Sequence, residues 1–292
     1  MSHNLKLKKQ HAHMPDTLER FFAHKLAVIG LILLLLMILA VVILPGALRL
    51  DPYKTYIEGG FNQKPGPNHW LGTDKVGRDI FARVVFGGRV SLSVGIISTL
   101  VAMGIGLPLG LLAGYYGGWI EACIMRLADI FMSFPAMMLI LVLVAVIGPS
   151  LTSITIVLGI LGWTQFARLL YSGVLSVREK DYIESAKALG VKNFEIMIKY
   201  ILPNSFDPCI INMTFRTAAS ILLEAGLSFL GMGVQPPTAS WGNMMYDAQS
   251  IVVLSTQPWV WIPPGICLII TVLSINFFGD GLRDALDPKM KI

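Results

Sequence analysis

Charged side chains are scarce in this sequence: Asp, Glu, Lys and Arg make up 14% of the 292 residues, against about 25% in an average soluble domain. Hydrophobic residues account for 54%, and the mean hydropathy is +0.67. A chain of this size cannot bury so much apolar surface in a water-soluble core, so most of it must lie in lipid. The scarcity excludes an ordinary soluble protein, and the modest net charge of +5 does not indicate nucleic-acid binding.

Cysteine is also scarce, and the motifs of common enzyme sites are missing. Cys123, Cys209 and Cys267 are far apart and lie in or beside apolar runs, so neither a disulfide framework nor a zinc site is indicated. The sequence contains no G-x-x-x-x-G-K-[ST] segment and therefore no phosphate-binding loop. H-E-x-x-H and G-x-S-x-G are absent as well. We therefore expect no catalytic residue, no metal site and no cofactor bound by this chain.

Long apolar runs dominate what is present. The first, Leu26–Leu44, has no charge and is longer than the core of a cleavable signal peptide, so we expect it to remain as a membrane helix. Further runs of spanning length lie at residues 90–112, 124–147, 151–175, 206–230 and 259–278. The sequence thus predicts an all-α membrane protein with six transmembrane helices, a first span at 26–44 and a transmembrane domain over 90–280.

Lys and Arg are unevenly distributed among the segments between these runs. They are frequent in 1–25 and 176–204 and recur in the tail 281–292, whereas the loop 232–258 has none. Because basic residues favour the cytoplasmic side of a membrane, both termini and the 176–204 segment are predicted to be cytoplasmic. The loop 45–89 is then extracytoplasmic, although its own basic residues run against the rule.

The first outer loop contains a segment with one apolar face. Over residues 76–88, apolar side chains can line one side of a short helix while Arg78 and Arg83 reach polar surroundings. We expect this helix to lie in the outer membrane interface. Arg78, Asp79 and Arg83 are candidates for an outer docking site, and simple anchoring in the interface is the alternative.

Three glycines in the second apolar run share one helix face. Gly106, Gly110 and Gly114 recur every four residues. Such small-residue faces let two membrane helices approach closely. We therefore expect close packing against a second helix here, without a specific functional role.

Ionisable residues are rare inside the apolar runs. Glu224 stands in an otherwise uncharged stretch, and an isolated membrane carboxylate is a candidate functional residue. Either a hydrogen bond that fixes helix packing or a loop, or contact with the substrate path, would explain it. Arg126 and Asp129 are three residues apart, so they share a helix face and can pair. For them a structural ion pair and a substrate site are the two interpretations.

The segment 181–203 predicts two short helices joined at Gly190. Asp181 and Glu184 form a start that resembles a capping box, and Gly190 is placed to end the first helix with positive φ. In the second helix, apolar residues at 194, 197, 198 and 201 lie on one face, and Pro203 ends it. On periodicity alone, an interfacial helix lying on anionic lipid also explains the segment.

The spacing within this segment resembles that of a known loop. Glu184-Ser185-Ala186, then Gly190 and later Leu202-Pro203, match the Glu-Ala-Ala loop of binding-protein-dependent ABC importer permeases, with Ser185 in place of the first Ala. Segments 69–92, 222–244 and 279–288 resemble the dipeptide/oligopeptide/nickel permeases of that family. These matches lie in order across most of the chain.

The resemblance implies a MetI-like helical permease that forms a heterodimer with a second homologous permease. Two ATPase subunits would dock on the cytoplasmic side and use the ATP, and a solute-binding protein would dock outside. The Glu-Ala-Ala loop would form a coupling helix at the joint with an ATPase. The implied location is the inner membrane of a bacterium, and the implied solute is a di- or oligopeptide, with nickel, metal chelates and glutathione-type solutes as alternatives.

Two other classes of protein stay open on the residues alone. A stand-alone secondary transporter would be expected to carry mid-span carboxylates or inverted repeats, and Glu224 is the sole candidate for the former. A membrane-embedded enzyme would need a nucleophile–base pair or a metal cluster at membrane depth, and the sequence indicates neither. Co-purification with an ATPase subunit would distinguish the permease from both.

Overall fold

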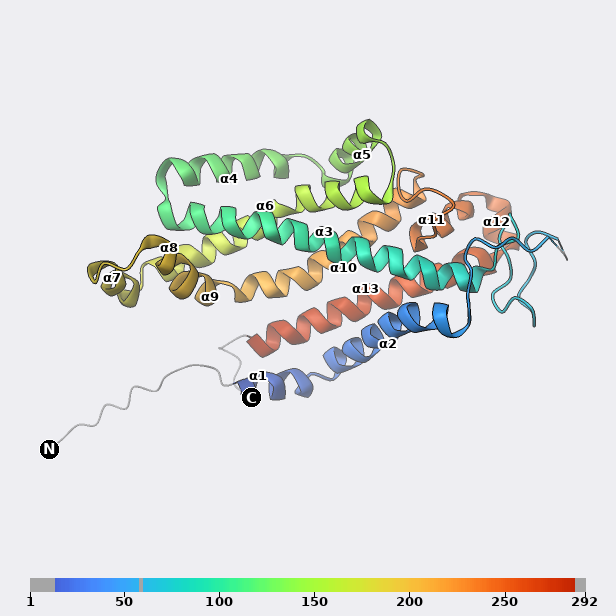
Figure 1. The fold of residues 1–292 in the computed structure, drawn as a ribbon, viewed down its shortest axis with the longest axis horizontal. Helices are drawn as coiled ribbons and strands as arrows, with labels where there is room; N and C mark the ends of the chain where they lie inside the picture. The colour runs from blue at the N-terminus through green and yellow to red at the C-terminus, as the bar shows by residue number, and fades with distance from the viewer. Residues whose placement is uncertain (1–13, 58–59, 287–292) are drawn as a thin grey trace.

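The chain folds into long helices that run back and forth between two ends of the molecule (Figure 1). The computed structural model describes residues 14–57 and 60–286. Within these ranges no strand forms, and extended pairing is limited to the isolated bridges Thr55–Arg78 and Thr73–Asp79. The predicted all-α class is confirmed, whereas the predicted tail segments 1–13 and 287–292 lie outside the described residues.

Successive long elements run in opposite directions (Figure 1). They are α2 (Lys25–Ala47), α3 (Ile80–Tyr116), the pair α4 (Gly118–Ser133) and α5 (Ala136–Ile147), α6 (Leu151–Arg178), α10 (Asp207–Phe229) and α13 (Pro258–Leu286). One end of the bundle carries α7 (Asp181–Ala188), α8 (Asn193–Glu195), a π-helix (Ile196–Ile201) and α9 (Leu202–Ser205). The other end carries α11 (Trp241–Met245), a 3₁₀-helix (Tyr246–Gln249) and α12 (Ile251–Thr256), and α1 (Met14–Ala23) precedes α2.

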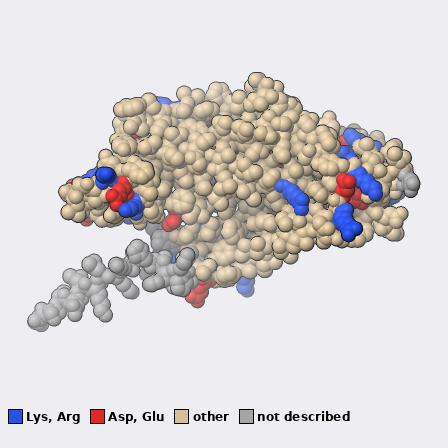
Figure 2. All heavy atoms as spheres, in the orientation of Figure 1, with Lys and Arg blue, Asp and Glu red and all other residues tan. Residues whose placement is uncertain are grey.

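Four of the described helices, α2, α3, α6 and α13, are long and apolar enough to cross a membrane, and α4 with α5 makes a fifth if the bent pair is one span. The fifth predicted span, 206–230, corresponds to α10, which is not among these helices because Asn212, Arg216 and Glu224 make it less apolar. The count of six therefore stays a prediction. On the face drawn in Figure 2, charged side chains gather mainly at the two ends and leave a largely uncharged band between them, as a membrane-spanning bundle requires.

Helix α3 begins at Ile80 rather than near residue 90. The Asp79 side chain accepts a hydrogen bond from the Ala82 amide (2.9 Å) and so caps the helix, which then continues for 37 residues. No separate interfacial helix covers 76–88, and that prediction is wrong. Ile80 and Val84 are buried in an apolar cluster under the outer loops instead of lying on lipid.

The third predicted span is broken at Phe134. Proline disfavours helical geometry at the residue before it, and Phe134, which precedes Pro135, has an extended ψ of 143°. Helices α4 and α5 therefore meet at an angle of 90°. A single helix over 124–147 is wrong, because Pro135 divides it into two shorter helices.

Helices α3 and α6 approach so closely that only glycine fits between them. A Cβ at Gly110 would lie 2.4 Å from the carbonyl oxygen of Ala167, and a Cβ at Gly106 or Gly114 would lie 2.5 or 2.6 Å from an atom of α6. Any side chain at these positions would overlap the backbone or side chains of α6. The predicted close approach along the glycine face is confirmed.

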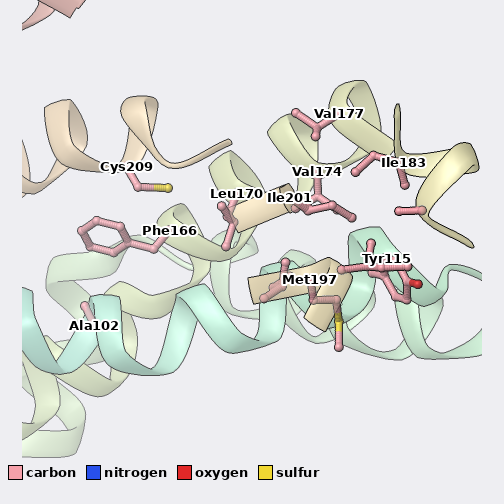
Figure 3. Packing of buried hydrophobic residues seen from close by; sticks show 13 residues of the cluster. Ala102, Tyr115, Phe166, Leu170, Val174, Val177, Ile183, Met197, Ile201 and Cys209 are labelled. Atoms are coloured by element: carbon pink, nitrogen blue, oxygen red, sulfur yellow. The ribbon is translucent and has the colours of Figure 1, made fainter. Parts of the chain in front are cut away.

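Buried apolar side chains form several clusters between helices rather than one continuous core. One of them joins α3 and α6 to the segment α7–α9 and is drawn in Figure 3. Helix α2 lies along α13, where a Cβ at Gly30 would be 2.7 Å from the carbonyl oxygen of Ser274. Much of the other side of α2 is exposed apolar surface, which suits contact with lipid.

The α3–α6 contact predicts opposite effects for one substitution at two positions of the same helix. Gly110→Ala should cost about 1–3 kcal/mol, because the added methyl forces the two helices apart. Gly104→Ala is the matched control: no atom lies within 4 Å of its Cβ position, and better helix propensity should stabilise it by up to about 1 kcal/mol. The thermal unfolding midpoint of the detergent-solubilised transporter measures both, and equal midpoints would contradict the packing argument.

Candidate functional site

The segment 181–205 forms a helical hairpin at the end of α6. Its inward side chains include Ile183, Met197 and Ile201, which are buried against Tyr115 of α3 and Val174 of α6 (Figure 3). The hairpin therefore packs onto α3 and α6, the two helices that approach each other along the glycine face. Burial of this kind stabilises the position of the hairpin relative to α3 and α6.

The first helix of the hairpin, α7, starts without a side-chain cap. Its N-cap residue is Lys180, and Asp181 lies inside the helix, so the predicted capping box is not formed. The Ser185 hydroxyl instead donates a hydrogen bond to the carbonyl oxygen of Asp181 (2.9 Å). Asp181 and Glu184 still lie in the first turn, where negative charge is favourable at a helix N-terminus.

Gly190 ends α7 as predicted, with φ at +77°. The Gly190 amide donates to the carbonyl oxygen of Lys187 (3.0 Å), and the Val191 amide donates to that of Ala186 (3.1 Å). This is the paired hydrogen-bond pattern of a Schellman motif, which satisfies two carbonyls at the helix end. No atom lies within 4 Å of the Cβ position of Gly190, so the requirement for glycine comes from backbone conformation alone.

The second half of the hairpin differs from its predicted face. The π-helix Ile196–Ile201 changes the spacing of side chains, so Ile196 is buried whereas Phe194 is 71% exposed and Ile198 is 40% exposed. Asn193 does not cap this half, because its side-chain oxygen accepts a hydrogen bond from the Tyr115 hydroxyl (2.8 Å). A pattern with the α-helical period of 3.6 residues does not predict which side chains of this π-helix are buried.

The outward surface of the hairpin combines polar and large apolar side chains. Glu184 and Ser185 are exposed, and beside them Leu189 (84% exposed) and Phe194 project from the same hairpin. Ala186, in contrast, is buried against the bundle, and within the loop Leu202 is half-buried and Pro203 exposed. Exposed apolar side chains at a polar end of a membrane protein are typical of a docking surface. The sequence pattern placed Phe194 on the same apolar face as Met197 and Ile201, and it gave no signal for Leu189.

Polar contacts tie the hairpin to the helix ends beneath it. The Arg178 guanidinium at the end of α6 donates to the carbonyl oxygen of Gly114 on α3 (2.8 Å). Lys199 pairs with Glu195 (2.6 Å), and this hydrogen bond raises the pKa of Lys199, but the pair is exposed and adds little stability. The Arg178 contact is the more important, because it joins α6 to α3 where the hairpin begins.

Glu224 lies at the opposite end of the bundle and is fully buried. Its carboxylate accepts hydrogen bonds from the hydroxyls of Ser91 on α3 (2.9 Å) and Ser228 on α10 (2.7 Å). These hydroxyls in turn accept hydrogen bonds from amides of the segment that follows α10, Trp241 to Ser91 (3.2 Å) and Val234 to Ser228 (3.0 Å). The geometry favours the packing and loop-anchoring interpretation of Glu224. The sequence did not predict that these serines contact Glu224, although Ser228 follows Glu224 by one helical turn.

The candidates for outer docking point into the protein. Arg78 and Arg83 converge on Asp74, with Nε–Oδ2 distances of 2.8 and 3.5 Å, and Arg83 is only 5% exposed. Asp79 caps α3 and contacts His69 Nδ1 (2.7 Å). Their burial favours a structural role that fastens the loop between α2 and α3 to the start of α3.

The predicted pair of Arg126 with Asp129 is not formed. Asp129 on α4 pairs instead with Arg168 on α6. Two helices that are distant in sequence from each other thus share the charge pair. Spacing along one helix could not reveal the partner, because it depends on how α4 lies against α6.

The fold and the exposed hairpin define a helical membrane permease of the ABC-importer kind. Residues 106–292 match the family described as the binding-protein-dependent transport system inner membrane component, and this chain belongs to that family. Residues 14–65 match the N-terminal TM domain of oligopeptide transport permease C. The predicted family and the MetI-like fold are confirmed, and the protein is a membrane component of a bacterial ABC importer.

Relatives extend the similarity over nearly the whole chain. The dipeptide transport system permease protein DppC of Alkalihalophilus pseudofirmus is 43% identical over 94% of this chain and 90% of its own. The glutathione transport system permease protein GsiD of Pectobacterium atrosepticum is 42% identical over 94% and 90%. The oligopeptide transport system permease protein OppC of Bacillus subtilis is 36% identical over 97% and 92%.

A solved structure supports the fold independently of close sequence identity. A chain of the MetNI methionine ABC transporter superposes with a TM-score of 0.58 at 21% identity, covering 70% of this chain and 97% of that chain. At this identity the likeness concerns the fold alone.

The Glu224 network predicts a local effect on the outer loop. Glu224→Ala should leave the two serine hydroxyls without their acceptor and weaken the loop by about 1–3 kcal/mol. Hydrogen exchange of the Val234 and Trp241 amides should become faster, while exchange in the hairpin at the other end stays unchanged. Glu224→Gln keeps one acceptor oxygen and should show a smaller effect. Unchanged exchange at both amides would contradict the anchoring role.

Proposed function

We propose that this chain forms, with a second homologous permease, the pathway through which an ABC importer takes up di- or oligopeptides. A solute-binding protein delivers the peptide from outside, and two separate ATPase subunits bind and hydrolyse the ATP. The relatives named for dipeptide and oligopeptide transport support this choice of solute. This chain lacks a phosphate-binding loop, so it contributes the pathway and not the hydrolysis.

The observation that carries the proposal is the exposed hairpin with its Glu-Ala-Ala-like segment. Glu184, Ser185, Leu189 and Phe194 form the outward surface, which we assign to docking of an ATPase subunit. The inward surface is packed on α3 and α6, and the Tyr115–Asn193 hydrogen bond joins it to α3. A partner that moves the hairpin therefore moves the ends of these helices as a rigid body.

ATP acts in this scheme only through its effect on the ATPase subunits. Binding of ATP favours one arrangement of the two ATPases, and the docked hairpins transmit that preference to the permease pair. A ligand shifts such an equilibrium only by its differential affinity for the two arrangements. The hairpin must therefore be held rigidly, as the Schellman turn at Gly190 and the buried cluster support.

We place both ends of the chain and the hairpin on the cytoplasmic side of a bacterial inner membrane. A cavity of about 390 Å³ supports this assignment, because Val177 of α6, Ser205 of α9 and Arg283 of α13 line it together. The described end of α13 thus lies beside the base of the hairpin. The absence of Lys and Arg from the loop 232–258 supports placing that loop outside.

Glutathione-type solutes are the second candidate class. A glutathione permease is as similar to this chain as the dipeptide permease is, at 42% identity. None of the relatives described above is named for nickel transport. Uptake of a labelled dipeptide, with competition by glutathione, in cells that depend on this transporter distinguishes the two classes.

The Schellman turn predicts a coupling defect from a single backbone change. Gly190→Val should cost about 1–3 kcal/mol locally, because a β-branched residue does not tolerate φ near +77°. The second half of the hairpin is then misdirected, so ATPase docking and peptide uptake should fall several-fold at near-normal membrane abundance. Pull-down of the ATPase, an uptake assay and a membrane immunoblot measure these quantities.

Two further variants test the same assignment. Gly190→Asn is the matched control, because Asn tolerates the left-handed region and nothing crowds the site, so docking should be largely kept. Glu184→Lys leaves the turn intact but reverses the charge of the docking surface, so docking should be lost. If the Val and Lys variants both bind ATPase and transport normally, the hairpin is not the coupling element.

The topology is tested by cysteine labelling after replacement of Cys123, Cys209 and Cys267. Lys187→Cys in the exposed hairpin should react only with a membrane-permeant reagent in intact cells. Val252→Cys, at an exposed position of α12, should react with an impermeant reagent added outside. Labelling of position 187 from outside would reject the orientation.

A further inference from the structure

An arginine in the middle of the bundle lacks a partner for part of its side chain. Arg216 is about 13 Å from the start of α10 at 1.5 Å per residue, and it lies beside Leu158 and Gly162, well inside α6. One Nη donates to the carbonyl oxygen of Leu158 (3.0 Å). The Nε is buried and has no hydrogen-bond partner.

No acidic side chain neutralises this guanidinium within the described ranges. None of the ion pairs found there includes Arg216. Asp129 pairs with Arg168, and Glu224 is held by two serines farther along α10. A cation at membrane depth is costly unless an anion or water reaches it. The fold therefore keeps Arg216 in a position that an external anion would stabilise.

Space for such a group adjoins the guanidinium. A cavity of about 170 Å³ is lined by Arg216, by Thr164 and Gln165 of α6, and by Phe131, Met132 and Phe134 at the break between α4 and α5. Each of its polar side chains can donate a hydrogen bond, and none of its lining residues is acidic. The volume accommodates a carboxylate rather than a whole peptide, so the remainder of the solute must lie outside this chain's cavity.

The room for the guanidinium depends on a glycine. A Cβ at Gly162 would lie 2.7 Å from an Arg216 Nη and 3.0 Å from its Nε. Asn212, one turn earlier on α10, also has a buried side-chain nitrogen without a partner. Two donors on the same side of α10 are thus unpartnered, which is unusual for buried polar groups.

A polar stripe leads from the cavity toward the hairpin. Gln165, Arg168, Ser172 and Ser176 are exposed on α6 and recur at intervals of three or four residues, so they share one face. A polar helix face is unfavourable in contact with lipid. We therefore expect this face of α6 to contact water or the partner permease. The Arg216 cavity is therefore continuous with a hydrophilic surface that runs to the cytoplasmic end.

We propose that Arg216 is the residue at which the translocation pathway binds a carboxylate of the peptide in transit. The inference rests on the proposed peptide-import function and adds a chemical requirement to it. A planar guanidinium offers directed donors to a carboxylate, and Thr164 and Gln165 can add further hydrogen bonds. Binding in a hydrated pathway stays weak enough for release, as transport requires.

The test compares two peptides in membrane vesicles that hold the complete transporter with its binding protein at saturation. One is a neutral tripeptide with a free C-terminal carboxylate, and the other is the same peptide amidated. For each peptide, the wild-type rate is divided by the Arg216→Gln rate. The quotient for the free-acid peptide is then divided by the quotient for the amide. Any preference of the binding protein for one peptide cancels in this ratio, because the same binding protein serves both transporters.

Arg216→Gln should lower uptake of the free-acid peptide at least about tenfold more than uptake of the amide, a difference of about 1.4 kcal/mol. Arg216→Lys keeps the charge without the planar fork and should give an intermediate ratio. Arg126→Gln is the matched control, because Arg126 is exposed on α4 and lines neither the cavity nor the polar stripe, and it should affect both peptides equally. An amidated peptide with a Glu side chain shows whether a side-chain carboxylate replaces the terminal one.

The outcomes separate this inference from the function on which it rests. If the Arg216→Gln transporter assembles and loses uptake of the free-acid peptide and of the amide to the same extent, the role of Arg216 is rejected. If the Gln variant does not assemble, the same result for Arg216→Lys rejects it. If the wild-type transporter imports neither peptide, the peptide-import function is wrong and the inference falls with it. If it imports peptides while the ratio stays near one, only the role of Arg216 is wrong.

Discussion

The contact between α3 and α6 is the constraint on which the rest of the structure depends. Three glycines on α3 have no side chains to keep the helices apart, so the backbone of α3 lies against backbone and Cβ atoms of α6. This approach places Gly114 within reach of Arg178 and Tyr115 within reach of Asn193, which fixes the hairpin. Without it, a partner pushing on the hairpin would move a loop rather than the bundle.

Ionisable side chains at membrane depth have different hydrogen-bond and ionic partners along the bundle, and these partners match the role assigned to each side chain. Glu224 is enclosed by serine hydroxyls, which convert a costly carboxylate into an anchor for the segment that follows α10. Asp129 and Arg168 neutralise one another across α4 and α6. Arg216 has one carbonyl acceptor and an adjacent cavity without an acidic lining residue, so it is the member of this set suited to a transient ligand.

The break at Phe134 and the polar stripe of α6 belong to the same arrangement. Because Pro135 divides the third span, residues from both sides of the break line the cavity at Arg216. From there the exposed face of α6 leads to the hairpin, so the proposed carboxylate site and the proposed coupling element both contact α6. A movement of α6 driven at its hairpin end would therefore reach the cavity.

Local chemistry is what the sequence by itself determined: the apolar runs that become helices, the glycine face of α3, and the positive φ of Gly190. Each follows from residues a few positions apart. Only the tertiary structure decided the extent of α3, the exposure of Phe194, the partner of Asp129 and the isolation of Arg216. These depend on contacts between helices far apart in the chain, and a π-helix or a loop packed under Ile80 leaves no periodic signal in one sequence.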